Sequence, residues 1–169
     1  IGAAHCGRRG LQKGVIGATV GKMVAKGAKA ERIVVTLGPC ICGDCYEVGG
    51  DIADEFDAQF PGTFTLSRFG QPGIDIAAAA LQELAKAGVP ADNVVSSRPR
   101  VNAATQYLSE ELAGICAADG EGDSRLAERF GKIRRSLCTY ENPLWFSHRR
   151  ASLAGKTHEG RMLALIVRE

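Results

Sequence analysis

The chain has 169 residues, of which 45% are hydrophobic and 24% are charged. This composition supplies enough apolar side chains for a buried core and excludes a disordered chain. A net charge of +2 without a basic stripe gives no indication of nucleic-acid binding, so we expect a small-molecule ligand. Since no segment resembles a membrane span or a charged-then-apolar leader, the sequence predicts a cytoplasmic protein that does not bind membranes.

The first 25 residues predict a strand end followed by a helix. Ile1–Ala4 are apolar or small, and residues 15–24 carry an amphipathic stripe, which places His5 on a strand-to-helix turn. Gly17 and Gly21 lie inside this helix, where each lowers its stability by about 1 kcal/mol relative to Ala. We expect close packing against a sheet to explain these two glycines.

Alternating strand and helix patterns follow. They predict a strand over 33–37, a helix from about 48 to before 61, a strand over 63–66, a helix after 73 that ends at Gly88 and Pro90, and a strand over 93–96. Asp75 stands near the start of the second of these helices and is interpreted as its N-cap, with a site function as the alternative.

The last third of the chain predicts a helical hairpin and two closing strands. Residues 97–137 carry two helical stripes with the turn Asp119–Gly122 between them, and their basic end is either a solvated face or an oligomer contact. Residues 145–148 and 162–167 are interpreted as strands, the second one central and buried. We therefore expect a single α+β domain, with a mixed β-sheet flanked by helices.

Three of the six cysteines are clustered at Cys40, Cys42 and Cys45. The absence of a leader favours reduced thiols over disulfides. Thiols at C-x-C-x-x-C spacing suit zinc, yet a structural zinc site takes four ligands and no fourth is near in sequence. Small side chains lining a tight loop are therefore the preferred interpretation, and a loop whose backbone amides hold an anion is the second.

Four motifs then carry a family resemblance. His5-Cys6-Gly7-Arg8-Arg9-Gly10 resembles the H-A-G-W-R-G signature of the bacterial laccase-domain family, also called the multicopper polyphenol oxidase family. Three later stretches agree with the same family, in the same order: 37–41 with 45–48, 138–142, and 146–150 with 160–162. Compared with this family, residues 97–137 are a helical insertion and a segment before Ile1 is missing.

The resemblance implies a zinc-dependent purine nucleoside phosphorylase that acts on adenosine, inosine, guanosine and methylthioadenosine, with adenosine deaminase side activity. Its partners would be a nucleoside and phosphate, and a homo-oligomer is possible. A peptidoglycan-precursor editing hydrolase is the alternative, as is an inactive fragment that lacks two metal ligands. Copper is less favoured than zinc, because three histidines cannot supply the ligands of several copper ions.

The resemblance also implies the site. His5 corresponds to a metal-binding and catalytic histidine, and the other two ligands of relatives, a His and a Cys, lie in the missing segment. The remaining implied site residues are Arg9 as a catalytic residue, and Arg149, Arg150, Cys138 and Gly38 as substrate-binding residues. The 138–150 segment and the His5 turn would meet at one pocket.

Three positions keep an alternative. One arginine of the Arg149–Arg150 pair could face a carboxylate such as Glu141 instead of substrate. Cys138 could line the pocket or be structural. Cys6 beside His5 suggests a Cys-His nucleophile, but adjacent residues of a strand point to opposite faces, which favours a small buried thiol.

Overall fold

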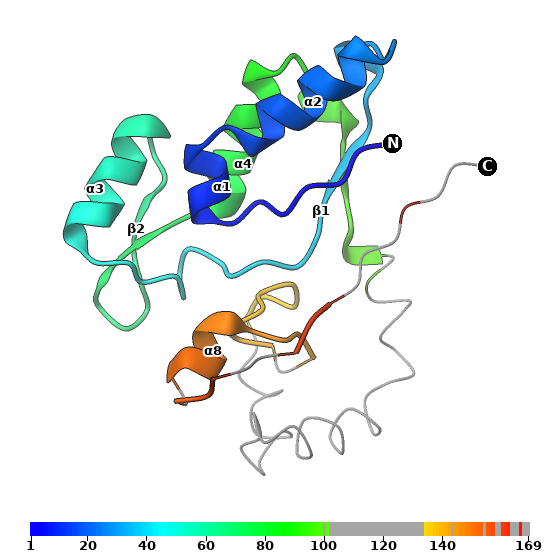
Figure 1. The fold of residues 1–169 in the computed structure, drawn as a ribbon. Helices are drawn as coiled ribbons and strands as arrows, with labels where there is room; N and C mark the ends of the chain where they lie inside the picture. Colours follow the sequence, from blue (N-terminus) through cyan, green and yellow to red (C-terminus); the bar gives the residue numbers. More distant parts are fainter. Residues whose placement is uncertain are drawn as a thin grey trace. The chain divides into compact units, whose positions relative to one another are not determined.

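The computed structural model describes residues 1–99, 101, 134–142, 144–153, 155–157, 160–162 and 166 (Figure 1). The chain divides into two compact units. Ile1–Leu37 and Gly43–Val95 form most of the first, and Gly38–Cys42 joins the described residues from Ser96 to Met162 in the second. The chain contains both helices and short strands, which confirms the predicted α+β class.

Three helices of the first unit pack together: α1 (Arg8–Gln12), α2 (Val15–Ala25) and α4 (Ile76–Lys86) (Figure 1). Their shared apolar side chains are almost inaccessible to solvent; they include Leu11, Ile16, Val20, Ala79, Ala80 and Leu84. The apolar stripes of α2 and α4 thus direct one face of each helix into the core, as their sequence periodicity predicts.

A second layer of the same unit is α3 (Gly50–Gln59) against the antiparallel pair of β2 (Phe64–Leu66) and β3 (Pro72–Ile74). Phe56 and Phe60 are fully buried, and their ring centroids are 4.8 Å apart. The strand β3 was not predicted. It pairs through Gly73, where an added Cβ would lie 2.6 Å from the Tyr46 carbonyl oxygen, so only glycine fits there.

The remaining described strands are β1 (Val35–Leu37) and β4 (Val94–Ser96), which pair with each other and confirm two predicted strands. Short 3₁₀ helices, η1 (Ala30–Arg32) and η2 (Ala91–Asn93), precede them. Within the described residues the strands therefore form two separate two-stranded sheets, where one mixed sheet was expected.

The second unit contains α8 (His148–Leu153). The strand predicted over 145–148 is wrong: residues 145–147 have no regular structure and the helix starts at His148. The Ser147 hydroxyl accepts the Arg150 N–H at 3.2 Å, which favours a helix start at this point.

Two further predictions concern segments that are described only in part. Met162 and Ile166 are 46% and 58% exposed and lie outside any strand, so the expected buried closing strand is wrong at these residues. The rest of that strand, at 163–165 and 167, lies outside the described residues, and so do residues 102–133 of the predicted hairpin.

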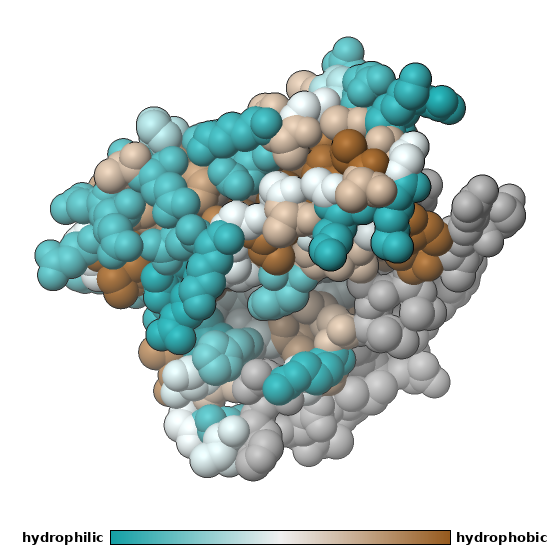
Figure 2. Space-filling model, turned by 45° about the horizontal axis from the view of Figure 1, so that its top comes forward, coloured by the Kyte–Doolittle hydropathy of each residue, from teal (hydrophilic) through white to brown (hydrophobic). Residues whose placement is uncertain are grey.

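Near the start of the chain, two local expectations are corrected. Residues 1–7 form no strand, so His5 precedes α1 in an irregular segment. Gly17 and Gly21 do not pack closely against a sheet, because an added Cβ at either position would meet nothing within 4 Å. Hydrophilic side chains cover much of the face drawn in Figure 2, with apolar ones between them.

Among the helices that the structure describes, none combines the length and the apolar character that a membrane crossing requires.

Candidate functional site

The segment around His5 is shaped by two glycines. His5 is exposed, and an added Cβ at Gly7 would lie 3.1 Å from its Nε2 atom. An added Cβ at Gly10 would lie 3.2 Å from the His5 carbonyl oxygen. Both distances are tighter than ordinary carbon contacts, so the spacing of these glycines leaves room for the His5 ring and its backbone.

The two arginines of this segment have different surroundings. The Arg8 guanidinium donates to Gln12 Oε1 at 2.8 Å, and Gln12 Nε2 donates in turn to Glu55 Oε1 at 3.1 Å. Arg9 is exposed and forms no side-chain hydrogen bond or ion pair with the part of the chain that is described. Arg9 is therefore the arginine of the pair that is available to an anion such as phosphate.

Cys6 is half-buried beside His5. Its burial raises the pKa of the thiol above the ordinary value of 9.0, and the sulfur contacts the Ala4 carbonyl oxygen at 3.7 Å. A protonated thiol is a poor nucleophile. This environment supports the interpretation of Cys6 as a small packed side chain, although its backbone is irregular instead of extended as a strand.

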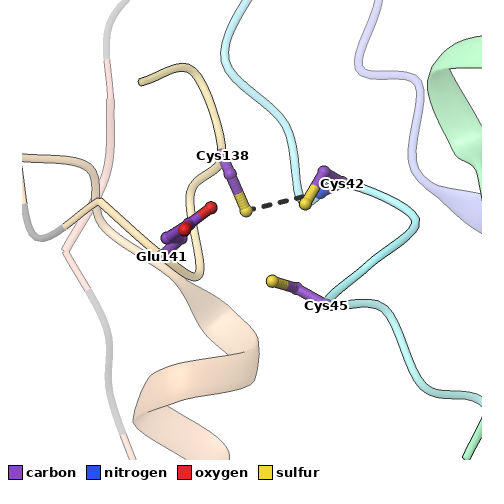
Figure 3. A group of neighbouring side chains, drawn as sticks. All are labelled: Cys42, Cys45, Cys138 and Glu141. Carbon is purple, nitrogen blue, oxygen red and sulfur yellow. Dashed lines mark hydrogen bonds between the residues drawn. The ribbon is translucent and has the colours of Figure 1, made fainter. Parts of the chain in front are cut away.

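A second group of chemically active side chains lies on two other loops (Figure 3). In the second unit, the sulfur atoms of Cys42 and Cys138 and a carboxylate oxygen of Glu141 lie within 4.8 Å of one another. We call these three residues the cysteine cluster. Cys138 is buried, whereas Cys42 and Glu141 are half-buried. Thiols and carboxylates are groups that could take part in holding a metal ion.

Backbone contacts hold the two loops of the cluster together. The Cys40 N–H donates to the Leu137 carbonyl at 3.1 Å, and the Thr139 N–H donates to the Cys40 carbonyl at 3.1 Å. These two bonds make a parallel bridge between Cys40 and Cys138. The Cys42 N–H then donates to Cys138 Sγ at 3.5 Å, which is the dashed line of Figure 3.

Arg150 fixes the loop that carries Cys138 and Glu141. Its guanidinium donates to the carbonyl oxygens of Thr139 at 2.9 Å and Tyr140 at 3.0 Å, and to that of Trp145 at 2.7 Å. A planar guanidinium suits this arrangement because its five N–H groups point outward in fixed directions. Arg150 is therefore a positioning residue for the segment between two members of the cysteine cluster.

Further bonds close the same loop. The Asn142 side-chain amide and the Trp145 indole both donate to the Ser136 carbonyl, at 2.7 and 2.8 Å. The Glu141 carboxylate accepts the backbone N–H groups of Arg134 and Arg135. The carboxylate thus has a fixed orientation within the loop.

Three further residues expected in the site are Arg149, Gly38 and His5. Arg149 is half-buried on α8, and Gly38 is exposed with open space around it. His5 belongs to no group of three or more potential metal ligands within the described ranges, so these residues do not complete a zinc site around it.

The sequence pattern indicated the thiol-rich loop over 40–45 but missed the proximity of Cys138 and Glu141 to Cys42. Cys138 lies 96 residues from Cys42.

Comparisons with known proteins agree on one family. Residues 1–120 match the family model described as multi-copper polyphenol oxidoreductase laccase. The chain is 43% identical over 89 residues to a purine nucleoside phosphorylase of Streptomyces griseus, covering 53% of this chain and 36% of the relative. It is 45% identical over 89 residues to a purine nucleoside phosphorylase of Deinococcus radiodurans, covering 53% and 35%.

A third relative has a different name. The adenosine deaminase RL5, from an unknown prokaryotic organism, is 37% identical over 102 residues, which is 58% of this chain and 39% of that protein. The matches to these three relatives span little more than a third of each relative's length. Because the family model matches well over half of the chain, the chain belongs to the multi-copper polyphenol oxidoreductase laccase family.

Proposed function

We propose that this protein is a purine nucleoside phosphorylase. The observation that carries the proposal is the similarity of half of the chain to two proteins of that name, at 43% and 45% identity. In phosphorolysis, a phosphate oxygen attacks C1′ of the ribose while the bond from C1′ to the purine nitrogen breaks. The electron pair of that bond leaves with the purine, which takes up a proton.

This reaction needs an anion site beside the sugar and a hydrogen-bond donor for the leaving base. Arg9 is the guanidinium best placed for phosphate, because it is exposed and forms no side-chain bond with the described residues. The neighbouring His5 is also exposed and is proposed to donate a hydrogen bond to the departing purine. Arg149 is proposed as a further substrate contact, whereas the printed bonds of Arg150 favour a positioning function.

The substrates proposed are adenosine, inosine, guanosine and methylthioadenosine. Adenosine deamination is the second candidate activity, and the similarity to the adenosine deaminase RL5 favours it. The two reactions differ in their second substrate: phosphorolysis consumes phosphate and releases the free base, whereas deamination consumes water and releases ammonia.

Arg9→Ala tests the proposal. With inosine as substrate, we expect hypoxanthine release by the purified protein to require phosphate. The substitution removes a charge-assisted contact to phosphate, which is worth about 1.5–3 kcal/mol, so kcat/KM for phosphate should fall by about 10-fold to 100-fold. The measurement is hypoxanthine release by chromatography at several phosphate concentrations.

Arg32→Ala is the matched control, because Arg32 is also an exposed arginine of the first unit but lies on η1. It should leave kcat/KM for phosphate unchanged. Hypoxanthine release that does not depend on phosphate would refute phosphorolysis. An equal loss in both variants would refute the assignment of Arg9.

A further inference from the structure

We propose that Cys42 and Cys138 are a redox pair, which a hydroperoxide converts into a reversible disulfide within the second unit. Both residues belong to this unit: Cys42 ends its Gly38–Cys42 segment, and Cys138 lies in its 134–142 segment. The proposal rests on the contact between these two segments. It is independent of the proposed phosphorolysis.

The two sulfur atoms lie close enough for such a bond. They are within 4.8 Å of each other and lie side by side in Figure 3. A disulfide holds its sulfur atoms about 2.05 Å apart, so each sulfur has to move by roughly 1.4 Å or less. Rotation of each thiol about its Cα–Cβ bond supplies a movement of this size.

The backbone already brings the two residues together. Cys40 and Cys138 form the parallel bridge described above, and Cys42 lies two residues beyond it. The Cys42 N–H donates to Cys138 Sγ at 3.5 Å. The Cβ atom of Cys42 is two covalent bonds from that nitrogen, so the Cys138 sulfur lies next to the atom that carries the Cys42 thiol. We therefore expect the disulfide to form with little change in the backbone of either segment.

Hydrogen bonds on both sides of Cys138 keep its thiol in place. The Cys138 N–H donates to the Arg135 carbonyl at 2.9 Å, and the Cys138 carbonyl accepts the Asn142 N–H at 2.9 Å. The Arg150 guanidinium donates to the carbonyls of the two residues that follow Cys138. A sulfur on a backbone that is fixed in this way reacts preferentially with the partner that lies beside it.

Exposure determines the order of the chemical steps. Cys42 is half-buried, whereas Cys138 is 1% exposed, so a small peroxide in solution reaches Cys42 first. The Cys42 thiolate attacks one oxygen of hydrogen peroxide, the O–O bond breaks, and the departing hydroxide takes up the proton that the thiol lost. The product at Cys42 is a sulfenic acid.

The second step joins the two sulfurs. The Cys138 sulfur attacks Cys42 Sγ, the S–S bond forms, and the sulfenic hydroxyl leaves with the Cys138 proton as water. In total, two electrons pass from the two thiols to one peroxide, which becomes two water molecules. A dithiol reductant returns both cysteines to thiols by exchange through a mixed disulfide. Both cysteines are free thiols in the structure, which is the reduced state of the pair.

Peptide mapping of the oxidised wild-type protein is the direct test. The purified, reduced protein is treated with hydrogen peroxide, its remaining thiols are alkylated, and it is digested with trypsin. Because trypsin cuts after Lys and Arg, one peptide spans residues 33–68 and another spans 136–149. We expect mass spectrometry to find these two peptides joined, and dithiothreitol to separate them.

Single variants identify the sulfur within the 33–68 peptide, which contains three cysteines. Cys42→Ser should lower the yield of joined peptides by at least about tenfold, whereas Cys40→Ser should leave it within about twofold. In Cys138→Ser, the sulfenic acid at Cys42 has lost its partner and should be trapped by dimedone. Cys6→Ser is the matched control, because Cys6 is half-buried like Cys42 but lies in the first unit; it should leave the yield unchanged.

Two results would overturn the proposal: 33–68 and 136–149 peptides that stay separate in the peroxide-treated wild-type protein, or joined peptides that persist at the wild-type yield in Cys42→Ser. The first result needs no variant, so it decides the matter even if every variant fails to fold. None of these measurements uses enzyme activity, so failure of the proposed phosphorolysis would leave the redox pair untouched.

Discussion

Cys6 and His5 are neighbours in the sequence, but the thiol has the environment of a packing residue. Burial of Cys6 raises its thiol pKa, which means that the folded protein favours the neutral form. The neutral thiol therefore contributes to the stability of the folded protein at neutral pH. This contribution is lost as the pH rises through the raised pKa. A thiol that remains protonated at neutral pH supplies little thiolate for covalent catalysis.

Cys6→Ala should therefore leave phosphorolysis of inosine unchanged to within about twofold, because burial raises the pKa of the thiol and so keeps it protonated near neutrality. Alkylation of Cys6 by iodoacetamide, followed by peptide mass spectrometry, should be slow at pH 7 and accelerate only in alkaline solution. Rapid alkylation at pH 7, or loss of turnover in the variant, would revive the Cys-His nucleophile.

At the scale of single elements, α4 shows how one side chain determines where a helix begins. The Asp75 carboxylate accepts the N–H groups of Ala77 at 2.9 Å and Ala78 at 3.0 Å, which confirms the predicted N-cap. These two donors would otherwise have no intrahelical partner. Since α4 packs on both α1 and α2, its start affects the core of the first unit.

Asp75→Ala should lower the free energy of unfolding by about 1 kcal/mol, since both N–H groups lose their acceptor. Asp75→Asn keeps a capping oxygen and should retain most of the stability. Urea unfolding followed by circular dichroism measures both. The cap assignment fails if the two variants are equally destabilised, because the loss would then come from the charge and not from the acceptor.

Helices and strands with a clear hydrophobic period were predictable from the sequence. α2, α3 and α4 and the strands β1, β2 and β4 all lie where the patterns place them, within a few residues. β3 was missed because Pro72-Gly73 is typical of a turn, and only its pairing with β2 makes it a strand. Trp145 and Phe146 have the aromatic character of a strand, but the Trp145 indole donates to the Ser136 carbonyl and the Ser147 hydroxyl accepts the Arg150 N–H, and these bonds override that preference.

The cysteine cluster could be predicted only in part, for a related reason. The spacing of Cys40, Cys42 and Cys45 in the sequence indicates a loop that is rich in thiols. Cys138 and Glu141 lie beside Cys42 only because Cys40 and Cys138 form a bridge, which no local pattern encodes. Long-range pairing of this kind follows from tertiary structure alone.

At the scale of the whole molecule, the two units are stabilised in different ways. The first unit has an apolar core that includes Leu11, Phe56 and Phe60. In the described part of the second unit, the buried side chains are mostly polar: Ser97, Thr139, Asn142 and Ser147 accompany Cys138 and Ala151. A buried polar group stabilises a protein only when its hydrogen bonds are made. Replacing a buried polar side chain of the second unit should therefore lower the free energy of unfolding more than replacing an exposed side chain of the first unit.

Arg150→Lys tests this difference. It keeps the positive charge but loses the planar fork that reaches the Thr139, Tyr140 and Trp145 carbonyls, so buried acceptors lose their donors. We expect the second unit to lose roughly 1.5–3 kcal/mol of stability. The chain has one tryptophan, Trp145, so its fluorescence during urea unfolding reports on this unit specifically.

The matched control is Arg32→Lys, an exposed position of the first unit that should leave the Trp145 transition unchanged. If Arg150→Lys also leaves the urea midpoint of the Trp145 transition unchanged, the three carbonyl contacts do not hold the loop.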